Sequence, residues 1–259
     1  MQISVSLEQI EFFLAILVRV SAFMFTAPFF NTNNVPNRVK AGLAIFVAFV
    51  VNNSVPYTPL EYGSILSYSI IIMKEAVGGA ILGFFANVAQ HILSFVGQRI
   101  DIDMGFSMVS EFSQVTGSEV TITGTFYSYA VILIMMVTDL HLFLVQALAE
   151  SFNLIPVGGI TVDSNIYELM MVYMADYFIL AFRIVLPMYA AILIVDTILG
   201  ILAKVAPQMN MFAVGIQLKV SVGLITLYFM IRLLPGVSRI IYNEMFDLLQ
   251  SSVYYLGGS

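Results

Sequence analysis

Ionisable side chains lie inside long apolar stretches of this sequence, where they could relay protons, bind ions or pair with one another. Eight such residues occupy five of these stretches: Arg19, Lys74, Glu75, Asp139, Asp176, Arg183, Asp196 and Lys219. One or two of them would indicate a proton relay or an ion site, whereas eight spread over five stretches favour salt bridges between helices. We therefore expect these eight buried charges at contacts between the subunits of an assembly.

Residues for covalent or metal chemistry are not grouped in the sequence. There is no cysteine, which excludes a disulfide, a thiol nucleophile and thiolate metal ligands. His91 and His141 lie in different apolar stretches, and neither has a second histidine or a carboxylate at metal-ligand spacing. We find no nucleophile–base pair and no phosphate-binding loop. The sequence therefore predicts a protein that is not an enzyme, has no metal site and needs no cofactor.

The composition is that of an integral membrane protein. Of the 259 residues, 60% are hydrophobic and 10% are charged, and a soluble domain of this length could not bury so much apolar surface. The net charge is −6 and the basic residues are scattered, so no nucleic-acid surface is expected. Glu8 and Glu11 precede the first apolar stretch, which does not resemble a secretory signal. We expect an all-α membrane protein with lipid around it.

Six apolar stretches predict helices, at about 10–30, 39–51, 64–96, 126–148, 166–202 and 211–234. The third and fifth exceed the roughly 20 residues that cross a bilayer, so they tilt strongly or are covered by other protein subunits. Pro187 should kink the fifth helix. A turn over 204–210 should join the fifth and sixth helices. The positive-inside rule places the segments with Arg38, Lys40, Arg99 and Lys204 in the cytoplasm.

The longest polar interruption runs from about 97 to 123. Four carboxylates and the glycines Gly105 and Gly117 argue against a spanning helix there. Its soft apolar side chains, which are unusual for a solvated linker, are Met104, Phe106, Met108, Val109 and Phe112. Two interpretations remain open: a cytoplasmic loop with an amphipathic turn, or a segment inside a protein-lined passage, where irregular backbone is tolerated at membrane depth. Composition alone favours the cytoplasmic loop.

Three motifs together resemble a known family. The first combines Arg19 with APFF at 27–30 and VPNRVK at 35–40. The second is GQRID at 97–101 followed by GFSM at 105–108. The third is APQMNMFAVG at 206–215, which supplies the turn residues Pro207, Gln208, Asn210 and Gly215 and is followed by Leu218, Lys219 and Gly223. This pattern resembles the FliR family of flagellar biosynthesis proteins, whose virulence counterpart is the SctT component of injectisomes. One departure is Gln217, where the family often has proline.

The resemblance implies a component of the type III protein export gate at the flagellar basal body, in the bacterial inner (cytoplasmic) membrane. In that family one FliR assembles with several copies of FliP and FliQ, and with FlhB, into a helical channel for unfolded export substrates. Residues 1–165 would form a FliP-like part and 166–259 a FliQ-like hairpin with a C-terminal tail. The motifs favour a flagellar host over an injectisome.

The resemblance also implies that the loop at about 97–123 plugs the closed channel, and it reverses the preference for a cytoplasmic loop. The plug, or gasket, residues would be Met104, Gly105, Phe106, Met108, Phe112 and Gly117. The apolar side chains would exclude water and ions, and the glycines would let the segment swing aside.

Two other functions stay open. An ion-coupled secondary transporter for a small solute would use Asp176, Arg183 and Asp196 as coupling groups, although we find no clear inverted repeat. A purely structural scaffold would have a central loop that never moves.

Overall fold

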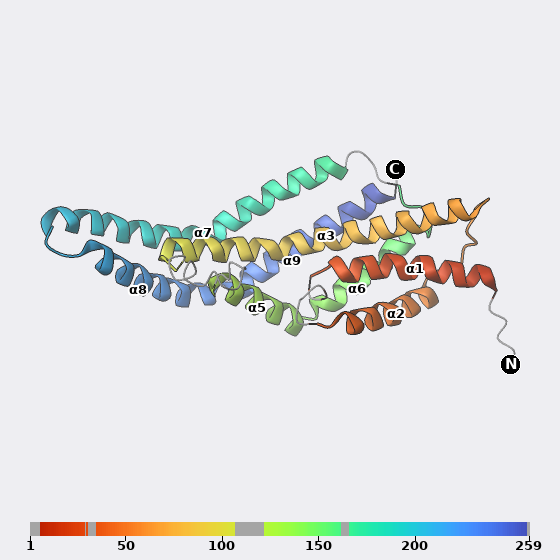
Figure 1. Ribbon diagram of the computed structural model, residues 1–259, viewed down its shortest axis with the longest axis horizontal. Helices are drawn as coiled ribbons and strands as arrows, with labels where there is room; N and C mark the ends of the chain where they lie inside the picture. Colours follow the sequence, from red (N-terminus) through yellow and green to blue (C-terminus); the bar gives the residue numbers. More distant parts are fainter. Residues whose placement is uncertain (1–5, 29, 31–34, 107–121, 162–165, 258–259) are drawn as a thin grey trace. The chain divides into compact units, whose positions relative to one another are not determined.

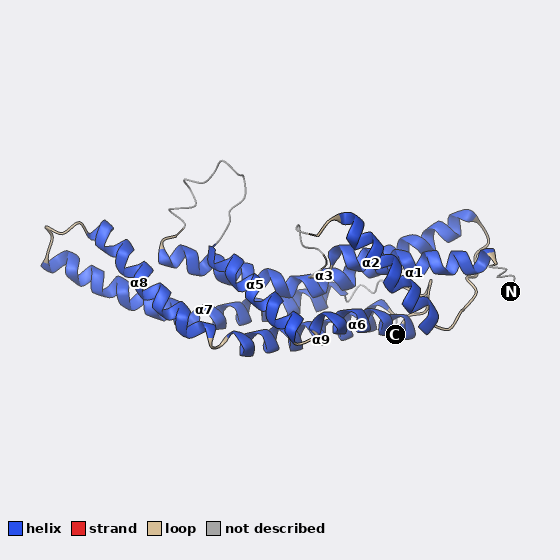
Figure 2. Cartoon of the chain, turned by 90° about the horizontal axis from the view of Figure 1, so that it is seen from below, coloured by secondary structure: helices blue, strands red, loops and turns tan. Residues whose placement is uncertain are grey.

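The computed structural model describes residues 6–28, 30, 35–106, 122–161 and 166–257. Every regular element in these ranges is a helix, and none is a strand (Figure 2). The helices, labelled in Figure 1, are α1 (Leu7–Thr26), α2 (Asn37–Ser54), α3 (Ile65–Met104), α5 (Ile122–Val137), α6 (Leu140–Leu154), α7 (Ile166–Val205), α8 (Met211–Ile231) and α9 (Leu234–Leu256). The prediction of an all-α membrane protein is confirmed.

Four of the described helices are long and apolar enough to cross a membrane: α1, α3, α7 and α8. The bent pair α5 and α6 would make a fifth span. Helices α3 and α7 have 40 residues each, which is about 60 Å and twice the hydrocarbon core of a bilayer. The expectation of overlong third and fifth helices is therefore confirmed. Helix α7 runs through Pro187 and changes direction along its length (Figure 1).

The described chain divides into two compact units. Unit 1 comprises Met1–Ala89, Thr138–Tyr173 and Tyr242–Ser259, and unit 2 comprises Gln90–Val137 and Met174–Ile241. Helices α3, α7 and α9 each contribute residues to both units. The predicted boundary at residue 165 concerns likeness to FliP and FliQ, and it stays a prediction.

In unit 1, glycines of α3 let the backbone of α1 approach closely. A Cβ atom at Gly79 would lie 2.2 Å from the carbonyl oxygen of Arg19. One at Gly83 would meet the side chain of Thr26 and the carbonyl oxygen of Phe23, 2.8 Å away. Only glycine fits such a contact between helix backbones. α1 itself starts with a capping box, in which Ser6 and Gln9 bond each other's backbone N–H.

In unit 2, α7 and α8 form a hairpin around the predicted turn at 204–210 (Figure 1). Asn210 is the N-cap of α8, where its side chain accepts a hydrogen bond from the N–H of Ala213. The ammonium of Lys219 on α8 lies 2.7 Å from the carboxylate of Asp196 on α7. Gly215 is buried, and a Cβ there would lie 3.3 Å from the side chain of Leu199. The predicted turn between the fifth and sixth helices is confirmed, and the likeness of this hairpin to FliQ stays a prediction.

The structure corrects the predicted helix at 126–148. Two helices replace it, α5 and α6, which are bent by 73°. The break falls at Asp139, whose φ of 58° is left-handed. Aspartate tolerates this conformation better than most residues, but a helix cannot continue through it. Asp139 is thus an exposed residue at a bend, not a charge inside a continuous apolar helix.

The structure also corrects the predicted loop at 97–123. Residues 97–104 are the last two turns of α3, and 122 and 123 begin α5. Arg99, Asp101 and Asp103 therefore project from a helix. Helix α3 continues through Gly97, which allows the close approach of α5 instead of forming a turn.

Candidate functional site at the end of α3

Helix α3 ends in a glycine cap at Gly105. The N–H of Gly105 donates to the carbonyl of Ile102 at 3.1 Å, and the N–H of Phe106 donates to the carbonyl of Asp101 at 2.9 Å. These two bonds and the φ of +84° at Gly105 make a Schellman motif, which favours glycine at the left-handed position. Gly105, predicted to be a point of flexibility, therefore has a defined role as the residue where the chain leaves α3.

The carboxylate of Asp101 joins the end of α3 to the start of α5. Asp101 is 5% exposed, and its two oxygens lie 3.2 and 3.1 Å from the backbone nitrogen of Thr123. It also accepts a hydrogen bond from the Thr123 hydroxyl. A carboxylate is favoured at this place because the N–H groups of the first helical turn carry partial positive charge. Sequence reasoning did not single out this pair.

The backbones of α3 and α5 touch one helical turn before this hydrogen bond. A Cβ at Gly97 would lie 1.9 Å from the Cα and 2.1 Å from the nitrogen of Gly124. Both glycines are buried. The contact and the Asp101–Thr123 hydrogen bonds together hold the end of α3 against the start of α5 within unit 2.

Met104 packs into unit 2. It is fully buried in the last turn of α3, and a Cβ at Gly223 of α8 would lie 2.6 Å from its terminal methyl. Of the other residues predicted for the plug, Phe106 is half-buried in the turn after α3. Met108, Phe112 and Gly117 lie outside the described residues.

Two ion pairs lie near this helix end. Arg99 and Asp103 pair at 2.8 Å on α3, and Lys219 and Asp196 pair at 2.7 Å between α8 and α7. Asp103 lies within electrostatic reach of Lys219 and Asp196, and its second oxygen is buried without a partner in the described part of the chain. The arrangement fixes helices and offers no nucleophile with a base beside it.

The buried charges that the sequence assigns to subunit contacts include one pair that the structure places inside unit 1. Arg19 and Glu75 are fully buried, and Nε of Arg19 lies 2.5 Å from Oε2 of Glu75. Nη2 of Arg19 also donates to Oε1 of Glu75 at 3.0 Å. These two residues therefore pair within the chain, and their expected contact with another subunit stays a prediction.

The same pair holds the turn after α6. Nη1 of Arg19 donates to the carbonyl of Ile155 at 3.1 Å, and Oε1 of Glu75 accepts from the N–H of Gly158 at 2.7 Å. The guanidinium carbon lies 4.1 Å from the ring centroid of Phe152, a cation–π contact. A buried pair is stable only when its remaining donors and acceptors are satisfied in this way.

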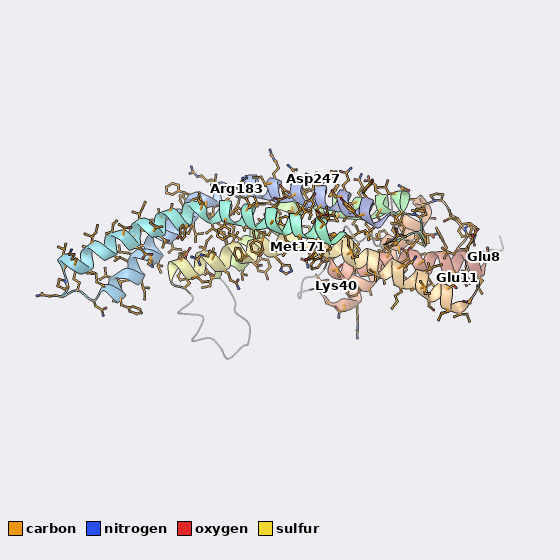
Figure 3. All side chains as sticks on the ribbon, turned by 90° about the horizontal axis from the view of Figure 1, so that it is seen from above. Glu8, Glu11, Lys40, Met171, Arg183 and Asp247 are labelled. Atoms are coloured by element: carbon orange, nitrogen blue, oxygen red, sulfur yellow. The ribbon has the colours of Figure 1, made fainter. Side chains whose placement is uncertain are left out.

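Of the other predicted charges, Asp196 and Lys219 pair with each other between α7 and α8, and the remaining four lie on exposed surfaces. Lys74, Asp139, Asp176 and Arg183 are exposed, and Figure 3 labels Arg183. Asp176 and Arg183 are seven residues apart, so they lie on one face of α7. Within the described ranges, however, no salt bridge joins them. Their predicted contacts with other subunits stay predictions. Pro207 and Gln208 are also exposed, in the turn of the α7–α8 hairpin.

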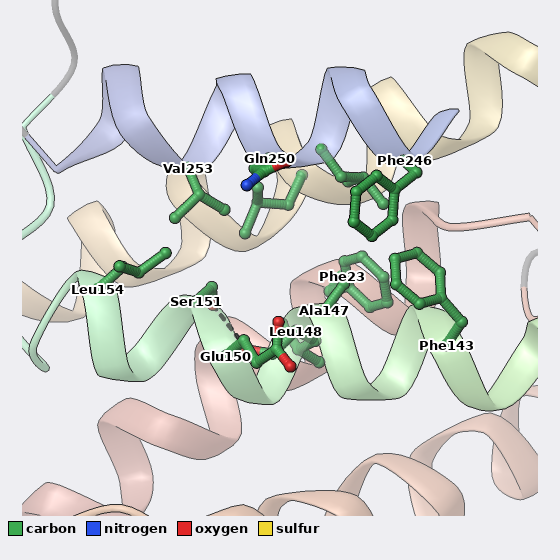
Figure 4. Close-up of a pocket in the computed structure, with 12 residues that line it drawn as sticks. Phe23, Phe143, Ala147, Leu148, Glu150, Ser151, Leu154, Phe246, Gln250 and Val253 are labelled. Carbon is green, nitrogen blue, oxygen red and sulfur yellow. Dashed lines mark hydrogen bonds between the residues drawn. The ribbon is translucent and has the colours of Figure 1, made fainter. Parts of the chain in front are cut away.

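Unit 1 also contains an apolar pocket of about 100 Å³, shown in Figure 4. The ring centroids of Phe143 on α6 and Phe246 on α9 lie 5.0 Å apart beside it. Glu150 and Gln250 are polar residues of its lining. Such a pocket suits an apolar group rather than catalysis. Among the described residues, no group of three histidine or carboxylate side chains could hold a metal ion.

Comparisons with known proteins agree with the motifs. The model of the family "Bacterial export proteins, family 1" matches residues 10–245. The flagellar biosynthetic protein FliR of Bacillus subtilis is 30% identical over 251 residues, covering 95% of this chain and 96% of that protein. FliR of Pectobacterium carotovorum is 29% identical, covering 93% and 92%, and FliR of Escherichia coli K12 is 26% identical, covering 90% and 89%. The chain therefore belongs to this family of bacterial export proteins, which includes the flagellar biosynthetic protein FliR.

Proposed function

We propose that this chain forms part of the flagellar type III export gate and plugs the channel through which unfolded flagellar subunits pass. Its membership of the FliR family and its apolar, overlong helices support a membrane component of the flagellar export apparatus. The expected partners are FliP and FliQ, in several copies each, and FlhB. The expected location is the bacterial inner membrane, at the flagellar basal body.

One observation carries the gating part of the proposal: both ends of the segment between α3 and α5 are anchored. The glycine cap at Gly105, the buried Met104 and the Asp101–Thr123 hydrogen bonds hold these ends in unit 2. A plug needs such anchors, because it must leave the channel axis and return to it without unfolding the channel wall. A solvated linker would need no buried carboxylate at its base.

In the proposed mechanism, apolar side chains close the channel and no covalent step occurs. Phe106, Met108 and Phe112 would pack against the channel wall in the closed state. An apolar constriction keeps a pore closed by excluding water, so opening requires the loss of that packing. Met is suited to this role because its flexible side chain fills irregular gaps. Gly117 would allow the segment to move aside when a substrate arrives, while the cap at Gly105 stays in place.

The test is a deletion of residues 107–117 from the chain in its assembled membrane complex. This deletion leaves Gly105, Asp101 and Thr123 in place, so the anchors persist. We expect assembly to continue and ion leakage through the complex to rise. The matched control replaces the same residues with a polar Gly/Ser segment of equal length, which keeps the chain length but removes the apolar packing, and leakage should rise again. Unchanged conductance in assembled complexes would exclude the plug and leave the structural scaffold.

A further inference from the structure

The N-terminus of α2 carries positive charge, and two of its N–H groups find no hydrogen-bond partner in the described part of the chain. Its N-cap is Pro36, which makes no side-chain cap hydrogen bond, and the first turn has no acidic residue. The N–H groups of Val39 and Lys40 donate to the carbonyl of Pro36. Those of Asn37 and Arg38 have no partner among the described residues. The positive end of a helix dipole is unfavourable for cations, yet Arg38 and Lys40 lie in this turn.

Lys40 is a buried cation in the first turn of α2. It is 7% exposed, and none of the salt bridges in the described ranges includes it. Its place on α2 is labelled in Figure 3. Lys40 lies in the first turn of α2, the end of the helix toward which helical side chains slant. A buried ammonium is costly unless an anion is bound beside it.

The outer face of α2 is apolar rather than polar. Val39, Leu43, Phe46 and Val50 are exposed and follow one another at helical spacing, and Ile45 and Phe49 flank them. Residues 39–50 cover about 18 Å of helix, close to the roughly 15 Å depth of one leaflet of the hydrocarbon core. Helix α2 contains no acidic residue. A cationic end continuous with an apolar stripe one leaflet long matches an anionic amphiphile in both charge and length.

We propose that the N-terminal end of α2 binds the phosphate of an anionic phospholipid, whose acyl chains lie along the stripe of Val39, Leu43, Phe46 and Val50. The exposed guanidinium of Arg38 and the ammonium of Lys40 would neutralise the phosphate. The N–H groups of Asn37 and Arg38, for which the described residues offer no partner, would complete an anion site of the kind that helix N-termini form. This site does not depend on the plug proposed above.

The test measures lipid retained by the full-length chain in its purified membrane complex. The complex is extracted from vesicles that contain equal phosphatidylglycerol and phosphatidylcholine, and bound lipid is identified by native mass spectrometry. We expect selective retention of phosphatidylglycerol. Arg38→Gln and Lys40→Gln should each weaken retention roughly five-fold, and together roughly 25-fold, because each basic residue near a membrane surface contributes about 1 kcal/mol.

Two control variants separate charge from folding. Lys204→Gln removes an exposed cation elsewhere and should retain lipid like the unaltered protein. Lys40→Arg keeps the positive charge and should preserve the preference for phosphatidylglycerol. Because Arg38 is exposed, Arg38→Gln should fold even if Lys40→Gln does not.

Three results would overturn the proposal. The first is retention without preference for phosphatidylglycerol, or equal retention by Arg38→Gln. The second is displacement of the lipid by millimolar inorganic phosphate alone, which would show a site for soluble phosphate. The third is a zero-length cross-link from the amine of Lys40 to a carboxylate of another protein in the complex, which would show a protein partner instead.

Discussion

Arg19 and Glu75, 56 residues apart in the sequence, form a fully buried ion pair that joins α1 to α3 and holds the turn at Ile155–Gly158. Each group depends on the other. The guanidinium has no second carboxylate in the described part of the chain, and the carboxylate has no second cation. The pair therefore decides whether the turn after α6 can keep its position against α1 and α3.

Replacing Arg19 with methionine should destabilise unit 1 strongly. The substitution leaves the Glu75 carboxylate buried without a cation, which costs about 3–5 kcal/mol in other proteins. Arg19→Met combined with Glu75→Leu should cost clearly less than the sum of the two single changes, since no charge is then left unpaired. The measurement is denaturant unfolding of the purified protein in detergent. The control is Lys74→Met at the exposed neighbour of Glu75, and additive single effects would contradict the pairing.

Replacing Gly97 with alanine should disrupt the contact between α3 and α5. The added methyl group would overlap the backbone of Gly124, where neither helix can yield by a side-chain rotation, and overpacking of this kind costs about 1–3 kcal/mol. Gly200→Ala is a matched control, because its Cβ would meet nothing within 4 Å and alanine favours a helix over glycine. The midpoint temperature of thermal unfolding should be higher for Gly200→Ala than for the unaltered protein, and lower for Gly97→Ala. Equal midpoints for the two variants would contradict the close contact.

Replacing Asp101 with asparagine should loosen the base of the proposed plug. Hydrogen bonds to a charged group contribute about 1.5–3 kcal/mol, and the amide of asparagine reproduces them only in part. Thr123→Val, which removes the hydroxyl donor, should have little further effect in the Asp101→Asn background. We expect raised ion leakage from membranes that carry the assembled complex, with its subunit composition retained. Asp176→Asn on an exposed face is the control. A leak no larger than in this control would show that the Asp101–Thr123 hydrogen bonds have no role in gating.

Much of the helical architecture could be predicted from the sequence because the apolar stretches are long. The bounds of α7 and α8 and the turn between them follow from hydropathy and from Pro207 and Asn210. The break at Asp139 could not be predicted, since both flanks are apolar and a left-handed aspartate leaves no periodic signal. The continuation of α3 through Gly97 could not be predicted either. In a sequence a glycine beside polar residues indicates a turn, and only the structure shows the helix that packs against it.

The pairing of charges also needs the tertiary structure. Arg19 and Glu75 could be identified as unusual because they interrupt apolar stretches. Which of the eight charges pair together depends on contacts between residues far apart in the sequence, and one sequence does not contain that information. The role of Asp101 could not be predicted, because it lies in a polar stretch, where a carboxylate is not unusual.

Tyr62 should titrate late in alkali, and the stability that its protonated form contributes should be lost as the pH rises from 10 toward 12. Its hydroxyl donates to Oε2 of Glu11 at 2.5 Å, and this hydrogen bond, followed by burial and the charge of Glu11, raises the pKa of Tyr62 from 10.0 to about 12. Because the folded-state pKa lies above the unfolded value, the stabilisation is fully present below pH 10 and is lost as the pH rises toward 12. In a phenolate absorbance titration, Tyr62→Phe should remove one late-titrating group. Tyr62→Phe should also lose less stability than the unaltered protein across this pH range, and a Tyr62 phenolate that forms near pH 10 would refute the hydrogen bond.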